Sequence, residues 1–267
     1  MLVGYFSYDI IRLIEKIPDR CKNDIDIPDI RLMRPRKLII YDNVKKKIFF
    51  IQNIFKDQNI NNYEFEYEKI KNTFKEFQHY GAIKLPSNFH KNKKKIKVKS
   101  NISKSKFKNI VLKAKNYIKK GDIFQVVLSQ RFEASIEKPP LEIYNTLRIL
   151  NPSPFMFYFN YKDFQVLGSS PEILVRLVNG EVTVRPIAGT RPRGKNKKQD
   201  NKLTSELLKD PKELAEHLML LDLGRNDVGK VSRLNSVKVT EKFKVEKYSH
   251  VMHIVSNVKG KLRKNCS

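Results

Sequence analysis

Two glutamates, Glu213 and Glu216, stand three residues apart in a segment with a well-specified helix start. Asp210 provides a helix N-cap, Pro211 suits the first helical position, and the acid at position 213 completes a capping pattern. A helix from here through about Leu221 would place both carboxylates on one face. By itself, such a pair is more often a solvated charge pair than a functional site.

The same predicted helix has an apolar stripe and one histidine. Leu214, Leu218 and Leu221 form the stripe, on a different face from the two glutamates. His217 directly follows Glu216. We interpret His217 as a packing or helix-face residue rather than a metal ligand.

A basic turn occupies residues 185–194, with the sequence RPIAGTRPRG. Its proline residues stiffen the backbone, and its guanidinium and backbone N–H groups suit an anionic ligand. The alternative is a surface turn whose arginines are only solvated.

An acid and two histidines stand in other short motifs. Glu172 follows Pro171 at the start of a predicted strand, where it is either an exposed strand end or a functional acid, since an unpaired buried acid is costly. His250 and His253 lie in the segment YSHVMH. An isolated histidine in an apolar strand is more often structural than catalytic.

The elements around these residues divide the chain near residue 97. The first part predicts strands at residues 37–41 and 47–51 and a helix at 65–80, followed by an aperiodic connector at 83–103. The second part predicts alternating helices and strands. The expected elements are a helix over 107–118 that stops at Gly121, a strand over 123–132, a helix over 141–150, strands at 155–161 and 164–168, and a hairpin of 172–177 with 182–187 around Asn179-Gly180.

Composition narrows the function classes. The chain has 267 residues, 40% of them hydrophobic, which is enough for a packed core. It shows no apolar run of membrane-spanning length and no signal-peptide layout at its start, so we expect a cytoplasmic protein without a membrane role. Its two cysteines have neither disulfide nor metal spacing.

The net charge of +26 would suit a nucleic-acid partner. Lysines are spread through nearly every segment, however, and only residues 91–99 form a dense basic run, which is typical of a solvated linker. We therefore expect no nucleic-acid partner, and a basic nucleic-acid-binding protein remains the alternative from another class.

Six segments in order carry a resemblance to a known family. They are residues 121–130 (GDIFQVVLSQ), 169–172 (SSPE), 185–194, 213–217 (ELAEH), 222–227 (DLGRND) and 248–253. Together they resemble the chorismate-utilising enzymes, and almost the whole chain is similar to the component I group of anthranilate synthases.

The resemblance implies an α+β fold, a layered sandwich of two mixed or antiparallel sheets with outer helices, incomplete at both ends. Residues 1–96 would be the remainder of an N-terminal domain plus a connector. Residues 97–267 would be a chorismate-binding domain, truncated at its C-terminal side. The family continues on both sides, so we expect the chain alone to be inactive.

The resemblance also assigns site residues. Glu216 matches a direct Mg²⁺ ligand, and Glu213 a nearby acid that holds the metal's water. Thr190 and its neighbour Gly189 match chorismate contacts. Glu172 matches a general acid that protonates the departing ring hydroxyl, and His253 matches the catalytic histidine.

Two positions bear on the nucleophile. In related isochorismate and salicylate synthases the position of Gln125 is a lysine that activates water, and glutamine cannot serve as a base. In most aminodeoxychorismate synthases the position of Ala188 is a nucleophilic lysine, and alanine offers none. Ammonia, supplied by a glutamine amidotransferase subunit, then remains as the expected nucleophile. The resemblance implies anthranilate and pyruvate as the products, in the first committed step of tryptophan biosynthesis.

The segment NPSPFM at 151–156 resembles the family's site for feedback tryptophan, with Pro154, Phe155 and Met156 as the best matches. It is equally a proline-rich turn before a strand. Two further alternatives stay open: an aminodeoxychorismate synthase component I, and an inactive remnant that only docks the amidotransferase.

Overall fold

The computed structural model describes residues 1–55, 63–79 and 96–266. The chain forms two compact units, residues 1–96 and 97–267. The predicted connector, up to residue 95, and the first part of the lysine run lie outside the described residues. No helix in the described part of the chain combines the length and apolar character that a membrane crossing requires.

The described residues of the first unit form two antiparallel strand pairs, a short 3-10 helix and one α-helix. The helix packs on the second pair through aromatic rings, because Phe50 meets Phe74 and Phe77 edge-on at centroid distances of 5.3 and 5.4 Å. The strands and helix predicted in the described part of this region are confirmed. The elements are β1 (Val3–Phe6), η1 (Tyr8–Leu13), β2 (Ile30–Met33), β3 (Lys37–Asp42), β4 (Lys47–Gln52) and α1 (Tyr63–His79), with β1 paired to β2 and β3 to β4.

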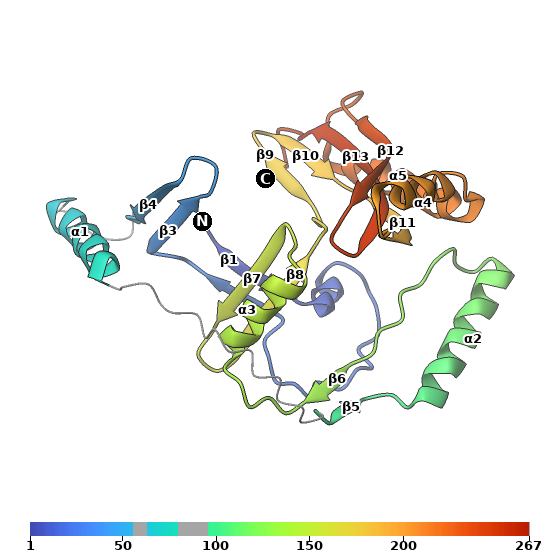
Figure 1. Ribbon diagram of the computed structural model, residues 1–267, viewed down its shortest axis with the longest axis horizontal. Coiled ribbons are helices and arrows are strands. Elements are labelled where there is room, and N and C mark those ends of the chain that lie inside the picture. Colours follow the sequence, from blue (N-terminus) through green and yellow to red (C-terminus); the bar gives the residue numbers. More distant parts are fainter. Residues whose placement is uncertain (56–62, 80–95, 267) are drawn as a thin grey trace. The chain divides into compact units, whose positions relative to one another are not determined.

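The second unit is built around one five-stranded antiparallel sheet, with two additional strand pairs (Figure 1). Its elements are β5 (Val98–Ser100), α2 (Lys104–Lys120), β6 (Phe132–Ala134), α3 (Pro140–Leu150), β7 (Phe155–Asn160), β8 (Gln165–Ser170), β9 (Arg176–Val178), β10 (Glu181–Val184), β11 (Ile187–Pro192), α4 (Lys197–Leu207), α5 (Pro211–Val231), β12 (Lys238–Lys247) and β13 (Val251–Lys261). The sheet has the order β11-β13-β10-β9, and β12 also pairs with β13.

Strand β13 organises this sheet because it pairs with β10, β11 and β12. Its side chains alternate between two faces. Met252, Ile254 and Val258 are fully buried and belong to the clusters that α4 and α5 help to form. Asn257 and Lys259 belong to the other face, where they line a cavity. The strand therefore separates a helix-covered core from a more open face.

Local signals fix the hairpin between β9 and β10. Asn179 and Gly180 have positive φ angles of 51° and 73°, which a two-residue turn of this kind requires at both positions. The predicted hairpin is confirmed, with shorter strands than the pattern suggested.

Helix α5 begins as predicted and continues further. Asp210 caps it by accepting hydrogen bonds from the backbone N–H groups of residues 212 and 213. The helix runs to Val231, ten residues beyond the predicted end, because its buried stripe continues through Gly224 and Val228. The predicted stripe is wrong at Leu218, which is 45% exposed.

The strand predicted over residues 123–132 is not formed. Only Phe132–Ala134 pairs, with Val98–Ser100. Phe124 and Val127 are 86% and 87% exposed. Alternation of side chains is not sufficient for a strand, because the backbone also needs a neighbouring strand to complete its hydrogen bonds. The helix before it, α2, ends as predicted at Gly121, which takes the left-handed conformation.

A matched pair of substitutions on α5 tests the core. Leu221 is 2% exposed and packs with Val182, Val228 and Val258, whereas Leu223 is 53% exposed. Leu221→Ala should lower the free energy of unfolding by about 2–5 kcal/mol, and Leu223→Ala by less than about 0.5 kcal/mol. Urea denaturation followed by circular dichroism measures both. Equal losses would contradict this assignment of the buried face.

Candidate active site

A β-bulge at Gly189 shapes the centre of the predicted site. The pairing of β11 with β13 is regular up to Ala188 opposite Ile254, and shifts before Thr190 opposite His253. Gly189 has a φ of +79°, and an added Cβ would lie 3.0 Å from the Ile254 side chain. Glycine is required here both by conformation and by space. The bulge leaves Ala188 buried and places Thr190 beside His253.

Thr190 connects the sheet to α5. Its hydroxyl lies 3.0 Å from Nδ1 of His253, and its backbone N–H donates to Oε2 of Glu213 at 3.2 Å. The structure thus brings together four of the predicted residues, Gly189 among them. An imidazole, a hydroxyl and a carboxylate converge at the bulge.

Glu213 is also part of an ion-pair cluster. Arg191 contacts its Oε1 at 3.3 Å and Oδ2 of Asp210 at 2.7 Å. The hydrogen bond from Arg191 lowers the pKa of Asp210. Because Arg191 already compensates its charge, Glu213 suits an indirect role better than direct ligation of a cation.

Glu216 follows Glu213 by three residues, about one helical turn along α5, and contacts Gln125. Nε2 of Gln125 donates to Oε1 of Glu216 at 3.2 Å. The described residues contain no group of three or more His, Cys, Asp or Glu side chains placed to hold a metal. The two glutamates fit Mg²⁺ in donor type, since this ion takes one or two carboxylates and retains several waters.

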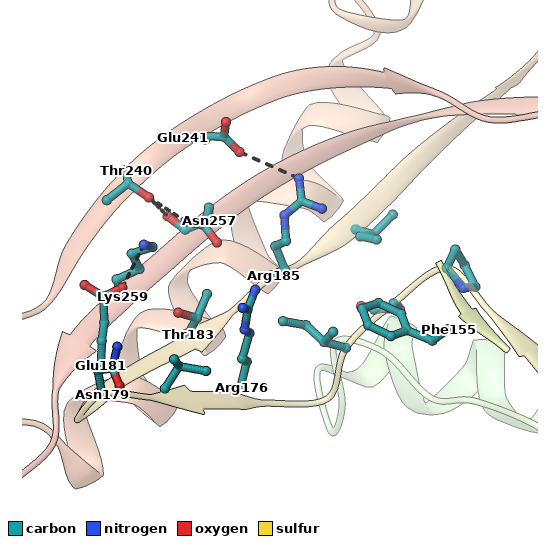
Figure 2. A pocket seen from close by; sticks show the side chains of 15 residues that line it. Phe155, Arg176, Asn179, Glu181, Thr183, Arg185, Thr240, Glu241, Asn257 and Lys259 are labelled. Carbon is teal, nitrogen blue, oxygen red and sulfur yellow. Dashed lines mark hydrogen bonds and ion pairs between the residues drawn. The ribbon is translucent and has the colours of Figure 1, made fainter. Parts of the chain in front are cut away.

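A cavity of about 970 Å³ lies over the open face of the sheet (Figure 2). Glu172 is one of the residues that line it. Glu172 is exposed on one side, yet partial burial raises the pKa of its carboxyl group. Phe155, at the start of β7, lines the same cavity, and Met156 and Pro154 flank it in sequence. Arg176 and Arg185 point into the cavity from β9 and from the link after β10.

Within the described residues, this cavity therefore includes only some of the predicted site residues. The cavity is lined by Glu172 but not by Thr190 or Glu216. It lies over the face of the sheet that carries Asn257, whereas α5 packs on the face that carries Val258. Tyr248 lies beside the bulge, because its ring contacts His253. Burial is the main cause that raises the pKa of Tyr248, and the charge of Glu172 is the smallest contribution in the same direction.

The arginines of the basic turn are ion-paired with acids of other elements. Arg185 pairs with Glu246 at 2.5 Å, and Arg193 pairs with Asp200 at 2.7 Å. Arg191 pairs with Glu213 of α5 and with Asp210, the N-cap of that helix. Each guanidinium fastens this segment to another element, so the interpretation of these arginines as only solvated is wrong.

Asp200 is the most strongly bound of these acids. It accepts hydrogen bonds from Nε and Nη2 of Arg193 and from the backbone N–H of Gly194. The hydrogen bonds from Arg193 are the main cause that lowers the pKa of Asp200 to about 2. The carboxylate thereby joins α4 to the end of β11.

This depressed pKa predicts a specific acid sensitivity. The stabilisation is fully present above the unfolded pKa of about 3.9 and is lost as the pH falls through the folded value of about 2. Asp200→Asn should lower the urea midpoint at pH 6 and lower it much less at pH 2. Asp222→Asn, which removes only an exposed helical pair with Arg225, is the matched control. A loss that is equal at both pH values would contradict the assignment.

His217 is a buried packing residue, as predicted. Its side chain is fully buried, and Nε2 lies 2.7 Å from the hydroxyl of Ser256. That hydroxyl also accepts the backbone N–H of Phe243 at 3.1 Å. Burial lowers the pKa of His217. The pair fixes α5 on β13 next to the glutamates.

Sequence reasoning did not single out Tyr248 or Glu246. The Tyr248 hydroxyl donates to Oε2 of Glu246 at 3.0 Å, directly beside His253. Tyr248 stands in the same motif as His253. Glu246 precedes Tyr248 by two positions, the spacing of residues on one face of a strand. That spacing was the available signal.

Comparisons with known proteins identify the family. The family model described as chorismate binding enzyme matches residues 1–267. The chain belongs to this family. Anthranilate synthase component 1 of Acetivibrio thermocellus is 45% identical in a match that covers 98% of this chain and 54% of that protein. The corresponding protein of Cereibacter sphaeroides is 47% identical, with 98% and 52% covered.

Solved structures agree with the family assignment. Anthranilate synthase component I from Streptococcus pneumoniae is 35% identical and superposes with a TM-score of 0.87, over 100% of this chain and 58% of that one. An isochorismate synthase from Bacillus anthracis described as putative is 26% identical, with a TM-score of 0.56 over 65% of this chain and 48% of that one. The α+β chorismate-utilising fold predicted from the sequence is confirmed. The chain spans about half the length of the curated relatives that it matches.

Proposed function

We propose that this chain belongs to the large subunit of an anthranilate synthase, which aminates chorismate with ammonia from glutamine and eliminates pyruvate to give anthranilate. The observation that supports this most strongly is the glycine bulge, which sets Thr190 against His253 in a member of the chorismate binding enzyme family. Relatives that are 45% and 47% identical carry the name anthranilate synthase component 1.

Glu172 is proposed as the general acid. Loss of the ring hydroxyl of chorismate as water requires a proton at the departing oxygen, and a carboxylic acid with an elevated pKa can hold that proton near neutral pH. The raised pKa of Glu172 at the rim of the cavity supports this role. His253, held at Nδ1 by Thr190, is proposed to position the substrate and to assist the later proton removal.

Gln125 and Ala188 support ammonia as the nucleophile. Gln125 donates an amide hydrogen bond to Glu216 and has no basic group with which to activate water. Ala188 is buried in β11 and offers no nucleophilic atom. Attack by ammonia on the ring carbon next to the carboxylate-bearing carbon, followed by loss of pyruvate, restores an aromatic ring.

Mg²⁺ is proposed as the cofactor, with Glu216 as a ligand and Glu213 as an acid that orients a metal-bound water. A bound Mg²⁺ would stabilise negative charge on the substrate carboxylate. The contact of Gln125 with Glu216 and the backbone N–H of Thr190 on Glu213 would orient the two carboxylates toward this task. A glutamine amidotransferase subunit as partner, and tryptophan as feedback inhibitor at Pro154–Met156, complete the proposal.

A chimera tests the function. Because the match covers nearly all of this chain and half of the Acetivibrio thermocellus protein, this chain can replace the matching half of that enzyme. We expect the chimera to form fluorescent anthranilate from chorismate, ammonium and Mg²⁺, and the isolated chain to form none. A chimera that folds but yields only aminodeoxychorismate or isochorismate, identified by mass, would overturn the proposal.

A further inference from the structure

Tyr248 lies in the turn between β12 and β13 and is fixed there by its backbone. Its N–H donates to the carbonyl of Val251 at 2.8 Å, and its own carbonyl accepts Nη1 of Arg193 at 2.6 Å. Arg193 is in turn held by Asp200. The residue therefore has a defined position before its side chain makes any contact.

The Tyr248 side chain is anchored by Glu246. The carboxylate uses one oxygen for Arg185, at 2.5 Å, and the other for the Tyr248 hydroxyl, at 3.0 Å. Burial acts to raise the pKa of Glu246, but the hydrogen bonds from Arg185 and Tyr248 outweigh it and lower that pKa. Burial, and then Glu246, raise the pKa of Tyr248 to about 12, so its hydroxyl remains a donor.

The anchored ring lies against His253. The two ring centroids are 5.5 Å apart at an interplanar angle of 59°, and Glu246 stands opposite His253 in the strand ladder. The Thr190 hydroxyl is hydrogen-bonded to Nδ1 of the imidazole at 3.0 Å. Within the described residues Nε2 has no hydrogen-bond partner, so one ring edge is held and the other nitrogen is left for a ligand.

We propose that Tyr248, anchored through Glu246 to Arg185, is a positioning residue that holds the His253 imidazole against Thr190. Its effect on catalysis rests on the proposed role of His253, whereas its effect on the imidazole does not. Packing alone would not require the hydroxyl, but the ion pair and the hydrogen bond fix the orientation of the ring that contacts His253.

NMR spectroscopy of the full chain labelled with ¹⁵N-histidine tests directly whether Tyr248 positions His253. The ring ¹⁵N and ¹H signals of His253, assigned by loss in His253→Asn, should shift in Tyr248→Leu and shift less in Tyr248→Phe, which retains the ring. Tyr117→Leu, an exposed tyrosine on α2, is the matched control and should leave these signals unchanged. Unchanged His253 signals in both Tyr248 variants would overturn the proposal. Should Tyr248→Leu lose its amide dispersion, Tyr248→Phe decides alone.

The active chimera adds a kinetic measurement. Misplacing a catalytic group by about 1 Å can cost on the order of 10²-fold in rate. We expect Tyr248→Leu to lower kcat by that order with KM nearly unchanged, and Tyr248→Phe to lower it less. Shifted His253 signals together with an inactive parent chimera would overturn the proposed function and leave the positioning role standing. Full activity of both variants would overturn a contribution of Tyr248 to the reaction.

Discussion

Glu172→Gln in the active chimera should lower anthranilate formation by about 10²–10⁴-fold, the usual contribution of a general acid. Glutamine preserves size and hydrogen bonding but cannot transfer the proton that the departing hydroxyl needs. The free energy of unfolding should change little, because Glu172 makes no side-chain ion pair in the described structure. Initial rates from anthranilate fluorescence at saturating chorismate and Mg²⁺ measure the effect.

Glu181→Gln is the matched control for this substitution. Glu181 lines the same cavity, and its carboxylate pairs with Lys259 at 2.7 Å on the exposed rim. It should keep most of the activity, since the ion pair is exposed and the residue has no proposed role with the reacting atoms. Similar losses in both variants would indicate that cavity charge, rather than proton donation, matters.

The pH dependence of the activity further separates proton donation by Glu172 from an effect of cavity charge. Burial raises the pKa of Glu172, and only the protonated form can act as an acid. Activity should therefore fall as the pH rises through that raised pKa. Glu172→Gln should remove this limb from the residual activity. A residual profile with the same alkaline limb would assign the limb to another group.

Local chemistry explains which parts of the fold could be predicted. The Asn179-Gly180 hairpin and the start of α5 at Asp210 and Pro211 depend on residues next to each other in sequence, and both are found. The segment at 123–131, which forms no strand, shows the opposite case. A strand is completed by hydrogen bonds to a partner, and side-chain alternation carries no information on whether a partner is present.

The site shows the same division. The motifs indicated Thr190, His253 and Glu213, and the fold brings these three together. The partners of the turn arginines could not be predicted, because Arg185 meets Glu246 from 61 residues away. Guanidinium groups in a basic turn look alike in sequence whether they await an anion or already hold one, and only the tertiary contacts distinguish the two cases.

Glu216→Gln should weaken divalent metal binding by more than about 100-fold, whereas Glu213→Gln should weaken it by about 10–100-fold, the usual effect of changing a residue that supports a ligand. The difference follows from the contacts of the two acids. Among the described residues Glu216 receives only a neutral amide, from Gln125, while Glu213 is already paired with Arg191. A neutral amide on Glu216 would replace the anionic oxygen that a hard cation requires.

Mn²⁺, measured by water-proton relaxation in the chimera with chorismate present, reports this binding without relying on turnover. The Mg²⁺ concentration for half-maximal activity should rise in the same order, with Glu216→Gln above Glu213→Gln. Asp222→Asn, on an exposed part of α5, should change neither quantity. The reverse order would exchange the two roles, because it would make the acid that Arg191 already neutralises the direct ligand. Unchanged metal binding in both variants would exclude this end of α5 as the metal site.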